Sequence, residues 1–283
     1  MCRLFAQMSP SPVSARDFLI DSKFSLLRQV EADPDNPQKD GWGLAWFGDD
    51  GRAHLAKSAA SAAREPERFS AAAEAARSSV VLGHIRAASN PHLDEAHAHP
   101  FCDDGWVFAH NGTLTIWPEV AQALGPRRAR LKTNSDSEVY FQQFLKHLER
   151  EKDASRAFEA CINESWSLWQ TCKDRYLGAD TPYTSLNAVA SNAHGLHAVC
   201  HASRKGLANA GVCHPDQPWS VMSFSMRDGR FILASEGLDG GPWTRLHPPE
   251  TISAVGDGGG IDIRRRPLSL SSAHGPVPEV SRQ

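Results

Sequence analysis

The chain begins MCRLFAQM (residues 1–8), which places a cysteine directly after the initiator methionine. Removal of Met1 would give Cys2 a thiol and a free α-amine, which together form a nucleophile and its base. The α-amine has an ordinary pKa of about 7.7–8.0, so a useful fraction can accept the thiol proton near neutral pH. Chance also allows a cysteine here, because the chain has six among 283 residues. The remaining residues decide between these interpretations.

Composition indicates an ordinary globular protein. Hydrophobic residues make up 41% of the chain, charged residues make up 22%, and the net charge is −3. This balance gives no basic footprint for nucleic acid or an anionic membrane. No apolar run approaches the ~20 residues that cross a bilayer, and no secretory signal begins the chain. The cysteine spacing fits neither a disulfide framework nor a zinc cage. We therefore expect a reduced, cytoplasmic protein with no nucleic-acid or membrane partner.

The hydrophobic pattern predicts strands, then helices, then strands in one domain. Strands are expected at 1–7, 43–47, 53–58, 80–86, 185–191, 196–202, 219–225, 230–235, 252–256 and 261–266. Helices are expected within 9–30 after a Pro/Ser loop, and at 62–79, 116–124, 136–151 and 154–173. We expect the domain to span residues 1–267 and a mobile Ser/Pro/Gly-rich tail to follow over 268–283.

Two short motifs could supply parts of an amide-cleaving site. AHNG (109–112) predicts a hairpin turn, in which the Asn111 side chain and the Gly112 backbone N–H could form an oxyanion hole. Arg86 in HIRAAS (84–89) ends an apolar strand, and its planar fork matches a carboxylate. Each motif also has an ordinary structural explanation, as a common turn and as an arginine that reaches solvent.

NSDSE (134–138) predicts a helix N-terminus with a capping box from Ser135 to Glu138. Asp136 in that first turn is favoured by the helix dipole, and it could also bind a substrate ammonium. An arginine for a carboxylate and an aspartate for an ammonium together describe the head group of an α-amino acid. If Cys2 acts on the side-chain amide of that amino acid, glutamine fits the description.

The order of motifs resembles the class II glutamine amidotransferases, a family of N-terminal-nucleophile hydrolases. These motifs are MC at the start, KDGWG (39–43), HIRAAS, HPF (99–101), HNG and SDSE. The chain looks most similar to the single-domain branch, which includes the γ-glutamyl hydrolases of ergothioneine synthesis and of yeast glutathione breakdown. The stretch ILASEGLDGGPWTRLHPPE (232–250) particularly resembles the ergothioneine-pathway members. The resemblance implies an α+β fold, the four-layer αββα sandwich.

The same resemblance implies the chemistry. Cys2 would be the nucleophile once Met1 is removed, and Asn111 and Gly112 would form the oxyanion hole. The reaction would cleave a γ-glutamyl amide through a glutamyl thioester, with no cofactor and no metal.

The resemblance also implies how the substrate is held. Arg86 would bind the α-carboxylate of the γ-glutamyl substrate, and Asp136 would bind its α-ammonium. Ser89 falls where relatives often have threonine, and we expect it to contact the substrate as well.

Three alternatives remain open from the sequence. The loop HLDEAHAHPF (92–101) could hold a metal if His97 and His99 share one face of a strand. The domain could be a glutaminase subunit that supplies ammonia to a separate synthetase. It could also be a catalytically silent binding module.

Overall fold

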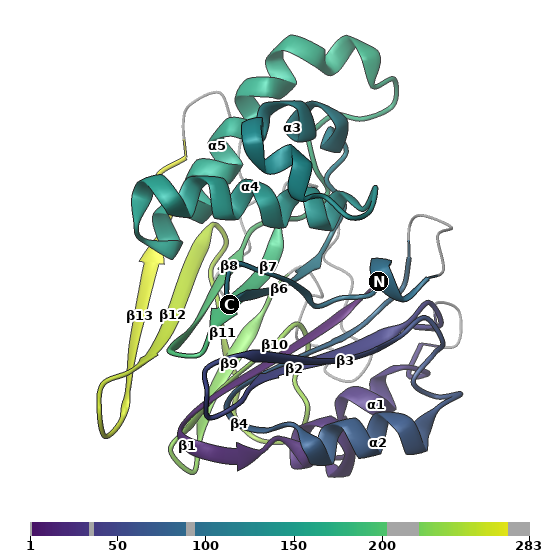
Figure 1. The fold of residues 1–283 in the computed structure, drawn as a ribbon, viewed down its shortest axis with the longest axis vertical. Coiled ribbons are helices and arrows are strands. Elements are labelled where there is room, and N and C mark those ends of the chain that lie inside the picture. Colours follow the sequence, from purple (N-terminus) through teal and green to yellow (C-terminus); the bar gives the residue numbers. More distant parts are fainter. Residues whose placement is uncertain (1, 34–36, 89–93, 203–220, 271–283) are drawn as a thin grey trace.

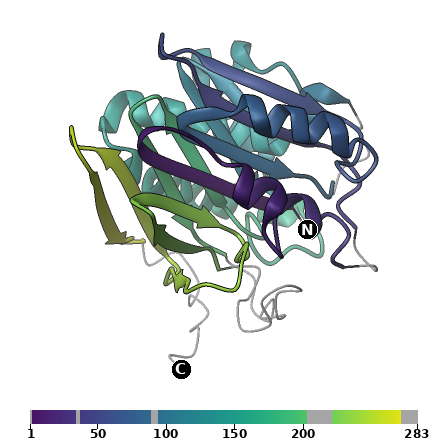
Figure 2. The ribbon, with the colours of Figure 1, turned by 90° about the horizontal axis from the view of Figure 1, so that it is seen from below.

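Two antiparallel β-sheets lie face to face, and helices cover the outer face of each sheet (Figures 1 and 2). The structure is a computed structural model, and it describes residues 2–33, 37–88, 94–202 and 221–270. These four layers confirm the predicted αββα sandwich. In the part of the chain that is described, no helix has the length and apolar character to cross a membrane.

The first sheet has seven strands with the N-terminal strand near its centre. In spatial order the strands are β11 (Thr244–Arg245), β9 (Ser223–Arg227), β10 (Arg230–Ala234), β1 (Arg3–Ser14), β4 (Arg77–Ile85), β2 (Trp42–Phe47) and β3 (Ala53–Ser58). Helical segments cover its outer face (Figure 1). These are η1 (Asp17–Asp21), α1 (Leu26–Gln29) and α2 (Pro66–Ala75).

The second sheet has six strands. In spatial order they are β13 (Ile261–Pro267), β12 (Glu250–Gly256), β8 (Gly195–Cys200), β7 (Asn187–Asn192), β6 (Trp106–Asn111) and β5 (Phe101–Asp103). Helices cover its outer face (Figure 1). They are α3 (Trp117–Ala123), α4 (Asp136–Glu151) and α5 (Ala154–Cys172). The described residues also form short 3₁₀ turns: η2 (Glu95–His97), η3 (Gly125–Arg130) and η4 (Lys173–Arg175).

Side chains that point alternately to the two faces of each sheet fill three apolar layers. In β1, Leu4 and Ala6 face the second sheet, whereas Phe5 packs against the helices outside the first sheet. In β6, Val107 faces the first sheet and Phe108 packs under α4 and α5. Because successive side chains of a strand point to opposite faces, a strand buried on both faces must be apolar throughout. Residues 4–6 of β1 and 107–109 of β6, which are apolar and buried, meet this requirement.

The expected helix within 9–30 is wrong in extent. β1 continues to Ser14 and pairs with β4 beyond a register shift between Met8 and Val13. Such an irregularity lets a Pro/Ser stretch remain in a sheet, because prolines are tolerated where ladder bonds are interrupted. The chain then forms only η1 and the four-residue α1.

The expected hairpin about Asn111 and Gly112 is also wrong. The hairpin that involves β6 lies before the strand, at Asp104 and Gly105, whose φ angles of 48° and 75° suit a tight two-residue turn. After Gly112 the chain makes an isolated antiparallel bridge, from Leu114 to Tyr183, and continues to α3. The Asn-Gly signal therefore marks a strand end.

The expected tail falls mostly outside the described residues, which end at position 270. Leu268 is buried against the helices of the second sheet, and its backbone N–H donates to the carbonyl of Pro249 over 3.0 Å.

We predict that Gly43→Ala will destabilise the fold. A Cβ at Gly43 would collide with the backbone carbonyl of His99, which crosses over β2 at this point. Forcing atoms into a filled site costs about 1–3 kcal/mol, and the free energy of unfolding measured in urea should fall by that amount. Gly259→Ala is the control, because no atom lies within 4 Å of its added methyl group. Equal stabilities of the two variants would contradict the close approach at Gly43.

Candidate active site

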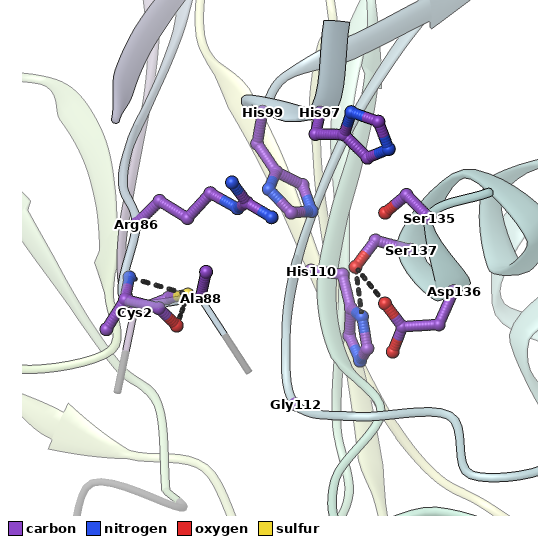
Figure 3. Close-up of a pocket in the computed structure, with 11 residues that line it drawn as sticks. Cys2, Arg86, Ala88, His97, His99, His110, Gly112, Ser135, Asp136 and Ser137 are labelled. Carbon is purple, nitrogen blue, oxygen red and sulfur yellow. Dashed lines mark hydrogen bonds between the residues drawn. The ribbon is translucent and has the colours of Figure 1, made fainter. Parts of the chain in front are cut away.

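The register of β1 against β4 sets the position of Cys2. Arg3 lies opposite Ile85, so Cys2 comes beside the residues that follow β4. Cys2 Sγ lies 3.4 Å from the backbone nitrogen of Ala87, which donates to it, and 3.5 Å from the carbonyl oxygen of Ala87. The thiol is therefore held by both polar groups of one peptide residue (Figure 3).

A buried ion pair anchors the start of β1. Arg3 Nε lies 3.1 Å from Glu236 Oε2, and the two side chains are 7% and 1% exposed. A guanidinium nitrogen of Arg3 also donates to the Cys2 carbonyl over 3.4 Å. Next to this pair, the Leu4 N–H donates to Ser235 Oγ over 3.0 Å. Ser235 and Glu236 belong to the stretch 232–250, which the sequence singles out only by its resemblance. Their contacts hold the backbone next to Cys2 in place.

Asp40 organises the segment that contacts the thiol. Its Oδ2 accepts the Ala88 N–H over 2.8 Å. The backbones pair as well, since Arg86 N–H donates to the Gly41 carbonyl over 2.8 Å and Asp40 N–H to the Arg86 carbonyl over 3.1 Å. The DGWG motif is therefore hydrogen-bonded to residues 86–88, the segment that contacts Cys2. The motif alone does not indicate this function of Asp40, because the residue that it binds is 48 positions away.

A single pocket brings four of the six predicted site residues together. Its lining residues are Cys2, Arg86, Ala87, Ala88, His97, His99, His110, Gly112, Ser135, Asp136 and Ser137. Cys2 and Arg86 lie on one side, and Asp136 and Ser137 lie on the opposite side, at the start of α4 (Figure 3).

Of the predicted site residues that the structure describes, Asn111 does not line this pocket. Asn111 ends β6, is 2% exposed and pairs with Asn187 of β7. Ser89 lies outside the described residues.

Gly112 occupies a position that excludes any side chain. A Cβ there would collide with the carbonyl oxygen of Ser185 and would also contact the His110 ring. Only glycine fits here, because the distant Ser185 carbonyl fills the space that a side chain would take. Gly112 also lines the pocket.

The start of α4 differs from the predicted capping box. Ser135 is the N-cap residue, as expected, but its side chain makes no capping bond. Glu138 accepts instead from the backbone N–H groups of Lys132 and Thr133, over 3.0 and 2.7 Å. The glutamate thus orders the preceding loop, and the Ser135 side chain is left in the pocket wall.

Burial dominates the electrostatics around the thiol. It raises the pKa of Cys2, while the Ala87 N–H and the charges of Arg86 and Arg3 oppose this change. Burial also lowers the pKa values of His84, to about 3, and of His99. Both imidazoles are therefore neutral at physiological pH.

The metal alternative assumed that His97 and His99 share a strand face, and this is wrong. His97 ends the 3₁₀ turn η2 and bonds to Asp94 and Asn134 over 2.6 and 2.8 Å. The ring of His99 packs on the ring of His84, with centroids 4.2 Å apart. Among the described residues, no group of three or more His, Cys, Asp or Glu side chains could hold a metal ion.

Comparison with known proteins identifies the family of this chain. The family model "Glutamine amidotransferases class-II" matches residues 1–210. The chain therefore belongs to the class II glutamine amidotransferases. Comparison with curated proteins finds no match.

Several solved structures share this fold. A glutamine aminotransferase class-II domain protein from Silicibacter pomeroyi has a TM-score of 0.65 at 22% identity, over 95% of this chain and 100% of that one. A predicted glutamine amidotransferase from Pseudomonas aeruginosa has a TM-score of 0.53 at 19% identity, over 92% and 99%. Glutamine phosphoribosylpyrophosphate amidotransferase from B. subtilis has a TM-score of 0.59 at 14% identity, over 95% and 50%. The present chain thus spans half of the last protein.

We predict that Asp40→Ala will slow alkylation of Cys2 by iodoacetamide. The thiolate is the reactive form, and the Ala87 N–H that Asp40 positions favours it, so losing that donor should raise the pKa of Cys2. The rate at neutral pH should fall about fivefold, which corresponds to one hydrogen bond of about 1 kcal/mol.

Two further variants control this experiment, which is read by mass analysis of the N-terminal peptide. Asp40→Asn keeps an acceptor oxygen and should lie close to the wild type. Asp50→Ala removes a carboxylate that also accepts a backbone N–H, from Arg52 in the β2–β3 turn, and should change nothing. If the alkylation rate of Cys2 depends on pH in the same way in Asp40→Ala and in the wild type, this function of Asp40 is ruled out.

Proposed function

We propose that this protein is an amidohydrolase that cleaves the γ-glutamyl amide bond of glutamine or of a γ-glutamyl conjugate. The observation that carries the proposal is that Cys2, Arg86, Gly112 and Asp136 line one shared pocket. Membership of the class II glutamine amidotransferases supports amide chemistry at this pocket. The single-domain γ-glutamyl hydrolases are the branch that we propose for it.

The walls of the pocket suit the head group of an α-amino acid. In the proposal, the Arg86 guanidinium binds the α-carboxylate through its planar fork. Asp136 binds the α-ammonium from the opposite wall. The γ-amide then extends toward Cys2 Sγ. Ser89 remains a predicted substrate contact.

The proposed reaction uses the α-amine of Cys2 as its base. The amine accepts the thiol proton, and Sγ attacks the γ-carbonyl carbon. The Gly112 N–H and the Asn111 side chain are the proposed donors to the resulting oxyanion. The tetrahedral intermediate collapses as the ammonium returns its proton to the departing nitrogen. This leaves a γ-glutamyl thioester on Cys2 and releases ammonia or an amine.

Water completes the cycle. The α-amine accepts a proton from water, and the hydroxide formed attacks the thioester carbonyl. The thiolate leaves and is reprotonated, and glutamate is released. Water is the final acceptor of the glutamyl group whether ammonia diffuses away or reaches a synthetase, so hydrolysis needs no partner.

We predict that the purified protein will release glutamate from at least one member of a panel of glutamine and γ-glutamyl amides. Cys2→Ala should abolish release and keep the wild-type circular dichroism spectrum. Cys102→Ala, which changes another partly exposed cysteine, should retain activity. Activity that appears only after a synthetase is added would support the ammonia-supplying subunit instead. Glutamate release by Cys2→Ala would exclude the thioester mechanism.

We also predict that the active protein begins at Cys2. Only a free α-amine on that residue can serve as the base, so intact-mass analysis of active protein should show loss of one methionine. Full activity in protein that retains Met1 would contradict the α-amine mechanism.

A further inference from the structure

The hydrogen bonds of His110 determine which of its nitrogens carries the proton. Nε2 lies 3.0 Å from the carbonyl oxygen of Ser185, and Nδ1 lies 3.0 Å from Ser137 Oγ. A carbonyl oxygen can only accept, so Nε2 is protonated. Burial lowers the pKa of His110, opposed by Asp136 and the Ser185 carbonyl, and the ring is therefore neutral. Its Nδ1 therefore accepts a hydrogen bond from the Ser137 hydroxyl.

The hydroxyl of Ser137 has two neighbours but only one proton. Besides His110 Nδ1, Asp136 Oδ1 lies 3.5 Å from Ser137 Oγ. When the proton points to His110, at the shorter distance, the lone pairs of Oγ lie near Asp136 with no proton between the two oxygens. The other carboxylate oxygen, Asp136 Oδ2, already accepts the Leu114 N–H over 2.8 Å. Two acceptors, Ser137 Oγ and Asp136 Oδ1, are thus left without a donor between them.

These two oxygens lie in the wall of the pocket. Ser137 is 5% exposed, and both residues line the cavity opposite Arg86 (Figure 3). Oxygens 3.5 Å apart can both lie within hydrogen-bonding distance of one nitrogen. A primary ammonium carries three N–H donors, so it can bond to both and retain a third for another acceptor.

We propose that Ser137 is a second binding residue for the substrate α-ammonium. This inference rests on the proposed function. Ser137 Oγ and Asp136 Oδ1 each accept one N–H from the ammonium, and His110 holds the Ser137 proton away from it. The substrates are therefore γ-glutamyl compounds with an unblocked α-amine. An N-acylated glutamyl compound lacks the charge and two of the donors, and it is excluded.

The test measures binding of L-glutamate and glutarate to the purified full-length chain by ligand-observed NMR titration. Glutamate is the product of every substrate proposed here, so the unknown leaving group does not enter. Glutarate lacks only the α-amine. Ser137→Ala should weaken glutamate binding about tenfold, the size of one hydrogen bond to a charged group, and should leave glutarate binding unchanged.

Two variants serve as controls. Ser137→Thr keeps the hydroxyl and should restore the wild-type ratio of the two affinities. Ser155→Ala changes a serine in the first turn of α5, whose hydroxyl bonds to Thr251 away from the pocket, and should leave both affinities unchanged.

The outcomes separate this inference from the proposed function. If Ser137→Ala weakens both ligands equally, the hydroxyl has only a structural role and the inference is wrong. Unchanged affinities for both ligands would also overturn it. If the wild type binds neither glutamate nor N-acetylglutamate nor any γ-glutamyl compound, the proposed function itself fails. Tight binding of N-acetylglutamate by the wild type would overturn the inference alone.

Discussion

The pairing of β1 with β4 is the constraint on which the site depends. The register that sets Arg3 opposite Ile85 places Leu4 between the sheets and Phe5 under the outer helices. Because side chains alternate along a strand, a slip by one residue would exchange these two faces. The same register brings Cys2 to Ala87. Burial of the apolar strand and placement of the thiol therefore have one cause.

The opposite wall depends on a second long-range closure. His110 bonds on one side to Ser185, before β7, and on the other side to Ser137 in α4. Gly112 admits the Ser185 carbonyl because it has no side chain. The end of β6, the approach to β7 and the start of α4 are thus tied together by one buried imidazole. The pocket lies where this wall faces the Cys2 wall.

Local patterns in the sequence predicted the elements whose causes are local. The bounds of α4 and the hairpin of β2 and β3 follow from periodicity and turn residues, and the structure confirms them. The Pro/Ser stretch after Met8 was misassigned because its pairing partner, the start of β4, is about 65 residues away, a separation that follows from the Val13–Ser78 pair. No local pattern reports such a partner.

The same limit applies to the site: its motifs were predictable from the sequence, but its long-range contacts were not. Motif order located Cys2, Arg86, Gly112 and Asp136, which do line one pocket. The residues that hold them escaped detection, because Asp40 acts on a residue 48 positions away and Glu236 on one 233 positions away. His110 and Ser137 lie within the AHNG and NSDSE motifs, but their proposed function depends on which atom carries one proton. Only the three-dimensional contacts reveal that.

The central claim is that Cys2 carries the glutamyl group during turnover. The most direct measurement is acid quenching of the purified protein during reaction with a γ-glutamyl substrate, followed by mass analysis of the N-terminal peptide. We predict a glutamyl adduct on Cys2 in chains that begin with this residue. The adduct should form and decay fast enough to account for the rate of glutamate release. Turnover without such an adduct, or with the glutamyl group on another residue, would contradict it.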